Sequence, residues 1–191
     1  IDWKVDGAIV LSGYTATVLS GTVYFDKHQV ITVDVTPEDG TESGVTVTGG
    51  PIVVENTPPS APGIEISPAS PSGEDPLECE IATESTDVDG DAVTYTYAWS
   101  VDGSVSASHT TATVAAADTT KGETWVVSVT PSDPFGSGSP GTASVLIANS
   151  DPILSAVDVT PDTGVTTSTT LTCGHTASDA DGDTLVVTYD W

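Results

Sequence analysis

The stretch from Asp87 to Trp99 decides the fold: Asp-Val-Asp-Gly-Asp is followed directly by Ala-Val-Thr-Tyr-Thr-Tyr-Ala-Trp. Carboxylates at Asp87, Asp89 and Asp91 alternate with small residues and bring together the hard oxygen ligands that calcium prefers. Over residues 93–99, valine, tyrosine and tryptophan alternate with threonine and alanine, which is the period-two pattern of a half-buried strand. The stretch therefore predicts an acidic, calcium-binding loop that leads into a strand with an aromatic inner face.

The same combination returns near the end of the sequence. Asp179-Ala-Asp181-Gly-Asp183 is followed, after Thr184, by Leu-Val-Val-Thr-Tyr-Asp-Trp, for which we expect a second strand over residues 185–191. A loop and strand that occur twice indicate an internal repeat.

Other matched segments give the length of the repeat. Pro37 and Pro131 stand 94 residues apart in two Val-Thr-Pro segments, and Cys79 and Cys173 are also 94 residues apart. The unit is therefore roughly 94 residues long. Because matched cysteines fall in different repeats, we expect no disulfide between them and treat both as small buried hydrophobic residues.

The phase of the repeat divides the chain into three parts. Residues 57–149 are one complete repeat, residues 1–56 are the C-terminal half of the repeat before it, and residues 150–191 are the N-terminal half of the next. Asn-Thr-Pro-Pro and Asn-Ser-Asp-Pro are the expected linkers. Both ends are expected to be cut through the third strand of a repeat, either because the chain is a slice of a longer polymer or because separate chains exchange strands.

The strongly acidic composition excludes some classes of binding partner. The formal charge is −25, from 28 acidic residues against three lysines and no arginine. Nucleic acid is excluded, since binding it requires a basic surface, and an anionic membrane surface is disfavoured for the same reason. No apolar run reaches the length of a membrane-spanning helix.

Seven short strands are predicted within the complete repeat, and no segment has a helical period. They are expected at Gly63–Ser67, Leu77–Thr83, Val93–Val101, Ser104–Ser108, Thr110–Ala115, Glu123–Thr130 and Ala143–Ala148. This spacing predicts an all-β fold of two-sheet antiparallel sandwiches, about seven strands in each repeat of roughly 94 residues. Trp99 on the third strand would face Cys79 and Val127, which is an immunoglobulin-like (Ig-like) core with one of its two cysteines missing.

Several motifs together resemble a known group of proteins. Asn-Thr-Pro-Pro, Leu-Glu-Cys, Asp-Val-Asp-Gly-Asp, Tyr-Ala-Trp and Val-Thr-Pro-Ser-Asp are similar to motifs of the Ig-like, PKD-like and cadherin-like tandem repeats of bacterial and archaeal surface proteins. The resemblance covers essentially the whole chain. It implies an extracellular, multi-domain, calcium-binding stalk or adhesin without catalytic activity.

The two acidic loops are the candidate metal sites. They are not EF-hands, because glycine and glutamate are needed at the sixth and twelfth positions, where the first loop has Ala92 and Ala98. Sandwich topology places the loop after the second strand, the loop after the sixth strand and the preceding linker at one end of a domain. The predicted calcium ligands are therefore Asp87, Asp89, Asp91, Asp133 and Asn56 in one site, and Asp179, Asp181 and Asp183 with Asn149 or Asp151 in the other.

No pattern in the sequence indicates an enzyme. The histidines His28, His109 and His175 have no partner acid or nucleophile at a recurring position, so we expect them on the surface or partly buried. Trp3, Trp99 and Trp125 are expected to pack in the core rather than stack on sugars.

We therefore expect a structural segment of a long extracellular filament, stalk or sheath, with domain junctions stiffened by Ca²⁺. Its partners would be other copies of the same repeat protein, end to end or side by side. The alternatives are a module of an adhesin that binds a glycan or cell-surface ligand, and an accessory domain of a secreted polysaccharide hydrolase.

Overall fold

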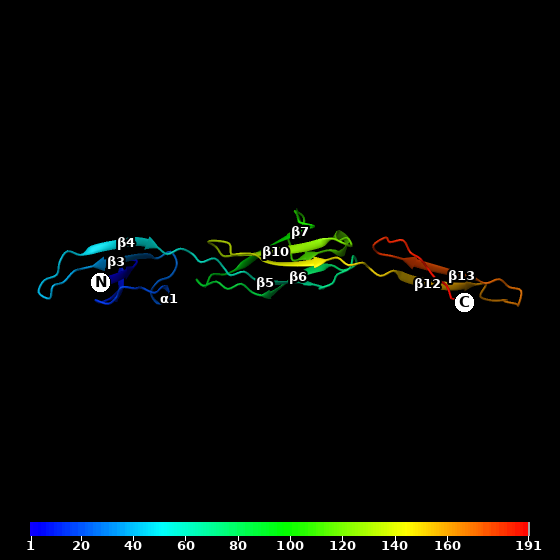
Figure 1. The fold of residues 1–191 in the computed structure, drawn as a ribbon, viewed down its shortest axis with the longest axis horizontal. Helices are drawn as coiled ribbons and strands as arrows, with labels where there is room; N and C mark the ends of the chain where they lie inside the picture. The colour runs from blue at the N-terminus through cyan, green and yellow to red at the C-terminus, as the bar shows by residue number, and fades with distance from the viewer. Residues whose placement is uncertain (191) are drawn as a thin grey trace. The chain divides into compact units, whose positions relative to one another are not determined.

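The structure is a computed structural model and describes residues 1–190. It is all-β, and its named strands pair in antiparallel sheets (Figure 1). The helices of this part of the chain are a single turn, α1 (Gly21–Tyr24), and a short 3-10 helix, η1 (Ala116–Asp118). Within residues 1–190, no helix has the length and apolar character needed to cross a membrane. The chain divides into two compact units.

The first unit comprises Ile1–Ser60, Ser85–Thr94 and Pro131–Ser139. It contains one four-stranded sheet with the order β2-β1-β3-β4. Its strands are β1 (Asp2–Val5), β2 (Ala8–Ser12), β3 (Val30–Val35) and β4 (Val47–Val53). The segments 85–94 and 131–139 bring the first acidic loop and Asp133 into this unit.

The hairpin of β1 and β2 is fixed by its turn. Asp6 and Gly7 both have positive φ, 50° and 82°, as the two central residues of a type I′ turn require. The carboxylate of Asp6 then accepts a hydrogen bond from the backbone N–H of Val30 at 2.9 Å, which ties the turn to β3. On one face of this sheet, Val5 and Ile31 are buried.

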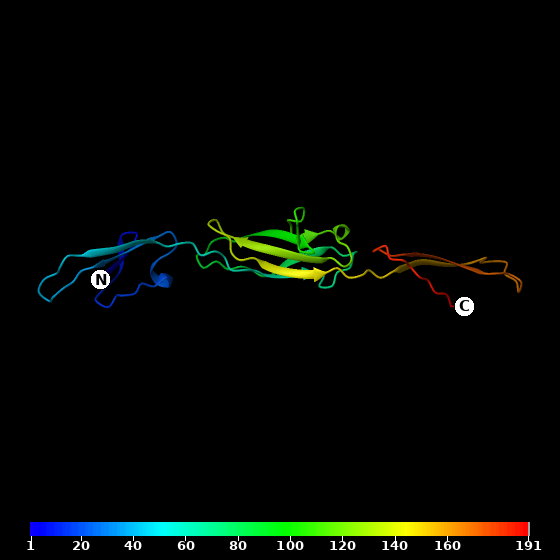
Figure 2. The ribbon, with the colours of Figure 1, turned by 45° about the horizontal axis from the view of Figure 1, so that its top comes forward.

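The second unit comprises Ala61–Glu84, Tyr95–Thr130 and the chain from Pro140 onward. Most of it is a two-layer arrangement that we call the central sandwich, with a three-stranded sheet β5-β6-β9 and a four-stranded sheet β11-β10-β7-β8 (Figures 1 and 2). The first sheet contains β5 (Gly63–Ser67), β6 (Leu77–Thr83) and β9 (Thr113–Val114). The second contains β7 (Thr94–Val101), β8 (Ser104–Ser106), β10 (Thr124–Ser132) and β11 (Gly141–Leu146).

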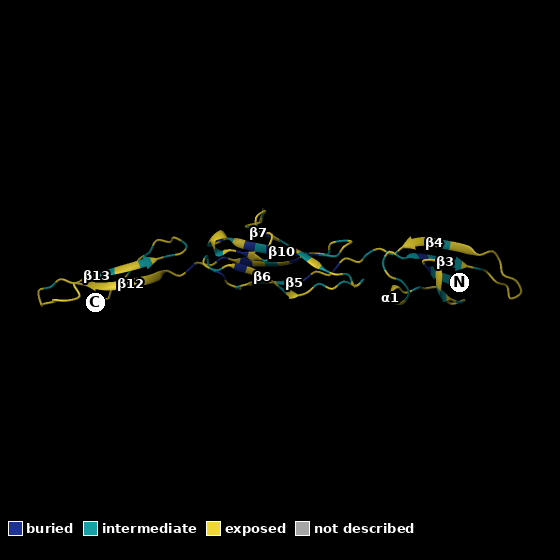
Figure 3. Cartoon of the chain, turned by 180° about the vertical axis from the view of Figure 1, so that it is seen from behind, coloured by how far each residue is buried: buried dark blue, intermediate teal, exposed yellow. Residues whose placement is uncertain are grey.

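The inward faces of these two sheets form one hydrophobic core. Trp99 and Trp125 are each 1% exposed and meet edge to face, with ring centroids 6.1 Å apart. Leu77 and Val127 are fully buried from opposite sheets, and Cys79 lies beside them. Figure 3 shows the buried residues gathered on β6, β7 and β10. The alternating pattern predicted these inward positions, and they are confirmed.

The strand positions also agree with the sequence pattern. β5 and β6 have the predicted bounds, whereas β9 is two residues long where six were expected. Cys79 and Cys173 are both free thiols; Cys79 is buried, as expected, whereas Cys173 is only partly buried.

The remaining strands form a two-stranded hairpin of β12 (Ile153–Thr160) and β13 (Thr172–Ser178). The strand expected over residues 185–191 is wrong for residues 185–190, which are not in a strand, and Trp191 lies outside the described residues. β7 is held as a strand by pairing in a four-stranded sheet. Residues 185–190 have no such paired strand in the described part of the chain, so their apolar sequence alone does not produce a strand.

Candidate metal centre

The first acidic loop is folded by its own carboxylate. Asp87 Oδ1 accepts hydrogen bonds from the backbone N–H groups of Asp89, at 2.9 Å, and Asp91, at 3.1 Å. Gly90 has a φ of +77°, a conformation that favours glycine, and its N–H donates to the carbonyl of Asp87. The alternation of aspartate with small residues therefore yields a tight loop in which one oxygen of Asp87 is used for folding and the other is left for a ligand.

The loop meets a third segment of the same unit. Oxygens of Asp87, Asp91 and Asp133 lie within 4.8 Å of one another. Asp133 is oriented by the backbone N–H groups of Phe135 and Gly136, both of which donate to its Oδ1 at 2.6 Å. The prediction that Asp133 joins the first loop thus agrees with the geometry.

The linker before the central sandwich is tied to the same cluster. Asn56 donates from Nδ2 to Asp133 Oδ2 at 2.9 Å, and this hydrogen bond is the main cause that lowers the pKa of Asp133 below its usual value. The backbone N–H of Thr57 donates to Asp89 Oδ2 at 2.7 Å. Asp89 therefore holds the linker, whereas Asp87, Asp91 and Asp133 form the cluster itself.

Two buried oxygens at this cluster lack a hydrogen-bond donor. Asp87 Oδ2 and Asn56 Oδ1 are both shielded from solvent and accept no hydrogen bond from the described residues. A buried carboxylate oxygen without a partner is destabilising, and a cation relieves that cost. The donor set consists of carboxylate and amide oxygens, which is the chemistry that calcium and magnesium require.

A lysine at the cluster was not predicted from the sequence. Lys27 Nζ forms an ion pair with Asp91, and it lies 4.4 Å from the centre of the Phe135 ring. The ammonium of Lys27 offsets one of the three negative charges of Asp87, Asp91 and Asp133, which leaves a local charge of −2. A single divalent cation would neutralise that remainder.

The second acidic loop has the same conformation as the first. Asp179 Oδ1 accepts from the backbone N–H groups of Asp181, at 3.0 Å, and Asp183, at 3.1 Å. Gly182 has a φ of +76°. Oxygens of the three aspartates lie within 4.8 Å of one another, so the second predicted triplet also forms a cluster.

The contacts around the second loop repeat those of the first. The backbone N–H of Ser150 donates to Asp181 Oδ2 at 2.5 Å, as Thr57 does to Asp89. Lys121 forms an ion pair with Asp183 and donates to Asn149 Oδ1 at 3.1 Å. The hydrogen bond to Asp183 is the main cause that raises the pKa of Lys121.

The lysine pair has a signal in the sequence. Lys121 follows Lys27 by 94 residues, the repeat length expected from the sequence, and they are two of the three lysines in the chain. Each forms an ion pair with the last aspartate of its loop. A search for basic residues at the repeat spacing would have found both.

The second cluster consists of the three aspartates of its loop, whereas the first takes Asp87 and Asp91 from its loop and Asp133 from another segment. Its lysine is more exposed, with 35% of the Lys121 side chain accessible against 15% for Lys27. Asp151 is exposed and is not one of the carboxylates that come together, so of the two alternatives only Asn149 reaches the cluster, through Lys121.

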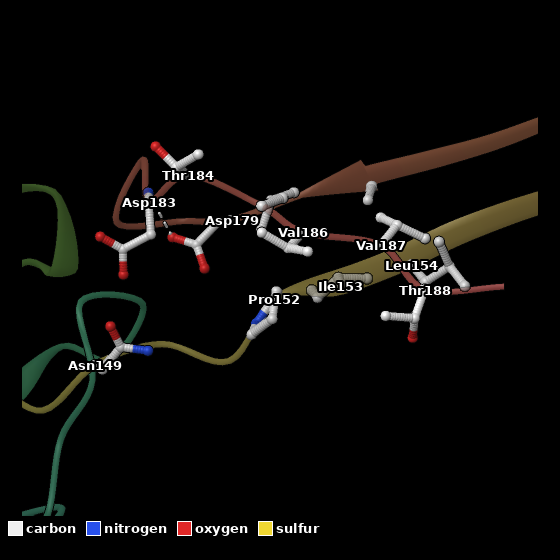
Figure 4. A pocket seen from close by; sticks show the side chains of 12 residues that line it. Asn149, Pro152, Ile153, Leu154, Asp179, Asp183, Thr184, Val186, Val187 and Thr188 are labelled. Atoms are coloured by element: carbon white, nitrogen blue, oxygen red, sulfur yellow. Dashed lines mark hydrogen bonds between the residues drawn. The ribbon is translucent and has the colours of Figure 1, made fainter.

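A cavity of about 460 Å³ lies beside the second cluster (Figure 4). Asp179, Asp183 and Asn149 line one end of it, and Leu154 and Val187 belong to its apolar part. The charged end lies next to the candidate metal site, and the apolar part lies along β12.

Among the described residues, neither carboxylate cluster includes a histidine. His109 is partly buried, as expected, and packs edge-on against Trp125 with 5.2 Å between ring centroids. Its ring nitrogens contact the Ser106 hydroxyl at 2.7 Å and the Asp118 carboxylate at 3.3 Å. These contacts hold the ring over the edge of the core. His28 and His175 are exposed and pack against Phe135 and Tyr189, respectively.

Comparison of this chain with protein-family models and with curated protein sequences gives no match.

Proposed function

We propose that this chain is a non-enzymatic structural segment of a long extracellular filament, stalk or sheath, built from tandem Ig-like sandwich repeats with junctions stiffened by calcium. One observation carries the proposal: the same acidic loop, ion-paired lysine and linker contact occur twice, about one repeat length apart. A site that is present in each repeat suits a structural role common to all repeats, whereas a site for a specific ligand would be confined to one of them.

Calcium is the cation that suits the donor set best. It accepts six to eight oxygen ligands in flexible geometry, whereas magnesium demands a near-octahedral site and retains several waters. At the first cluster, Asp87, Asp91 and Asp133 would supply carboxylate oxygens, and Asn56 an amide oxygen. The bound ion would remove the repulsion among carboxylates that are held close together.

Contacts of the linker support the stiffening role. Asn56 and Thr57 are linker residues, and they are hydrogen-bonded to Asp133 and Asp89 of the loops that surround the cluster. Ser60 N–H also donates to the Thr86 carbonyl at 2.9 Å. A cation that fixes these loops would also fix the linker, and would limit bending between successive repeats.

Small-angle X-ray scattering of the full chain in calcium and in chelator tests this role. We expect chelation to give a more flexible particle, visible as a raised high-angle region of the Kratky plot, with unchanged β content by circular dichroism. The core does not depend on the loops, so the sandwich should stay folded. Scattering curves that are identical across a calcium titration would contradict the stiffening role.

Matched variants assign the effect to each junction. Replacing Asp87, Asp89 and Asp91 together by asparagine should reproduce only the part of the chelator effect that arises at the first cluster. The same change at Asp179, Asp181 and Asp183 is the control. It should reproduce the part of the chelator effect that the first variant does not.

A further inference from the structure

The linker of residues 56–60 is hydrogen-bonded on one side to the first acidic loop and the residues just before it. The backbone N–H of Thr57 donates to Asp89 Oδ2 at 2.7 Å. Further along, the N–H of Ser60 donates to the Thr86 carbonyl at 2.9 Å, and the N–H of Thr86 donates to Ser60 Oγ at 2.8 Å. These bonds fix one side of the linker through protein groups alone.

The other side of the linker lies against the segment that follows β10 and supplies Asp133. Asn56 Nδ2 donates to Asp133 Oδ2 at 2.9 Å. Pro59, which is buried, lies against Gly138 of the same segment. The linker therefore lies between the two segments that bring their carboxylates to the first cluster.

At Gly138 there is no space for a side chain. A Cβ atom there would overlap the carbonyl oxygen of Pro59 and would lie 3.1 Å from Cγ of Pro131. The Pro59 oxygen belongs to the backbone, so it cannot rotate away as the end of a side chain can. The N–H of Gly138 donates to the Pro131 carbonyl at 2.9 Å, which holds this segment at the end of β10. Because the surroundings are closely packed, a larger residue at this position must push the linker outward.

We infer that Gly138 is a positioning residue of the first metal cluster. The absence of a side chain lets the linker lie close to the segment of Asp133, and the linker then sets how near Asp133 comes to the first acidic loop. The same placement directs Asn56, whose shielded Oδ1 has no hydrogen-bond donor among the described residues, to the cluster.

The inference deepens the proposed function and rests on it for the role of calcium, whereas the seat of the linker is made by protein contacts. Oxygens of Asp87, Asp91 and Asp133 lie within 4.8 Å of one another, so a displaced linker would separate donors that a single ion must reach. Residues that orient metal ligands typically change metal affinity by about 10- to 100-fold when they are replaced.

A second glycine in the same segment provides a matched control. A Cβ atom on Gly136 would lie 3.9 Å from both Asn56 Nδ2 and Pro58 Cγ, which is ordinary van der Waals contact. Neither Gly136 nor Gly138 has a positive φ, so alanine suits the backbone at both positions. Gly138→Ala and Gly136→Ala therefore differ mainly in whether the new methyl group collides with the linker.

Amide hydrogen exchange of the full chain, followed by NMR in chelator and in calcium, tests the seat of the linker. Thr57 and Ser60 are the probes, since their N–H groups are hydrogen-bonded and the two prolines between them have none. In Gly138→Ala we expect both amides to exchange at least about tenfold faster than in the native chain, because the collision opens the seat. Gly136→Ala should exchange as the native chain does. Equal exchange in the two variants would overturn the inference.

Calcium affinity tests the positioning role. Calorimetric titration is made in the full chain with Asp179, Asp181 and Asp183 replaced by asparagine, so that only the first cluster can bind. Gly138→Ala should raise the Kd by about tenfold or more, and Gly136→Ala should leave it close to that of the parent. Faster exchange with an unchanged Kd would refute the positioning role. A parent that binds no calcium would refute the proposed function instead, and the exchange rates would still decide whether Gly138 seats the linker.

A second pair of variants tests the same contact from the linker side and leaves the segment of Gly138 unaltered. Pro59 is buried, whereas Pro58 is exposed, and replacing either by glycine removes one proline ring. Pro59→Gly should speed exchange at Thr57 and Ser60 and raise the Kd for calcium, and Pro58→Gly should do so much less. Circular dichroism checks that the β content of each variant is native, and this pair decides if Gly138→Ala fails to fold. Equal behaviour of the two proline variants would contradict the inference.

Discussion

Replacing Trp99 by alanine should lower the free energy of unfolding of the central sandwich by about 3–5 kcal/mol. Trp99 is 1% exposed, and its indole N–H donates to the Thr111 carbonyl at 2.9 Å. The change removes a large buried side chain between the two layers, its edge-to-face contact with Trp125 and the hydrogen bond of its indole N–H. Urea denaturation followed by circular dichroism measures the loss.

Two control variants make this result specific. Val105→Ala on β8 alters a side chain that is 80% exposed and should change stability by less than about 0.5 kcal/mol. Trp3→Ala removes a tryptophan of the sheet β2-β1-β3-β4, where its indole N–H donates to the Ala16 carbonyl at 2.7 Å. Trp3 is only half-buried, so the cost should be clearly smaller. A Trp99→Ala cost below about 1 kcal/mol would show that the tryptophan does not hold the layers together.

Replacing Lys27 by methionine should tighten calcium binding at the first cluster by at least about tenfold. The ammonium of Lys27 is ion-paired to Asp91, so a cation bound there must displace it or tolerate its charge. Two unit charges 4 Å apart interact by about 4 kcal/mol at an effective dielectric constant of 20, and partial displacement reduces that repulsion. Methionine keeps an apolar stem of similar length against Phe135 while it removes the charge. Calorimetric titration with calcium measures the change.

The other two lysines provide the controls for this change. Lys4→Met alters the net charge equally, but Lys4 is paired with Asp34 at 2.5 Å and does not contact the cluster, so calcium binding there should be nearly unchanged. Lys121→Met should have a smaller effect at the second cluster, because its side chain is more exposed and solvent screens its charge. Equal effects of Lys4→Met and Lys27→Met would show that only net charge matters.

Much of the fold could be predicted because similar motifs recur along the sequence and because apolar residues alternate with polar ones within its strands. Leu77 and Cys79 alternate with glutamates, so the buried face of β6 is evident without coordinates. The acidic loops were also predictable, since an aspartate with a following glycine at the right spacing folds its own loop, as at Asp87 and Gly90.

What the sequence did not reveal depends on contacts between distant residues. Lys27 lies 64 positions before Asp91, and no local pattern links them; only the folded chain brings the ammonium to the carboxylate. The recurrence of the loop-and-strand motif predicted a strand over residues 185–191, but a strand needs a neighbour to pair with, and residues 185–190 are not in a strand. Asp151 was a candidate because of its place in the linker, yet a side chain in a linker can point to solvent, and it is exposed.

Calcium titration of the full chain by isothermal calorimetry, at about 0.15 M salt, tests the central claim most directly. We expect saturable binding with Kd values of about 0.1–1 mM, the range of extracellular modules, and a tighter first site, where Asp133 and Asn56 complete the donor set. Replacing Asp87 and Asp91 by asparagine should remove the first site and leave the second. The absence of saturable heat up to about 10 mM calcium, ten times the weakest expected Kd, would contradict the claim that these clusters are calcium sites.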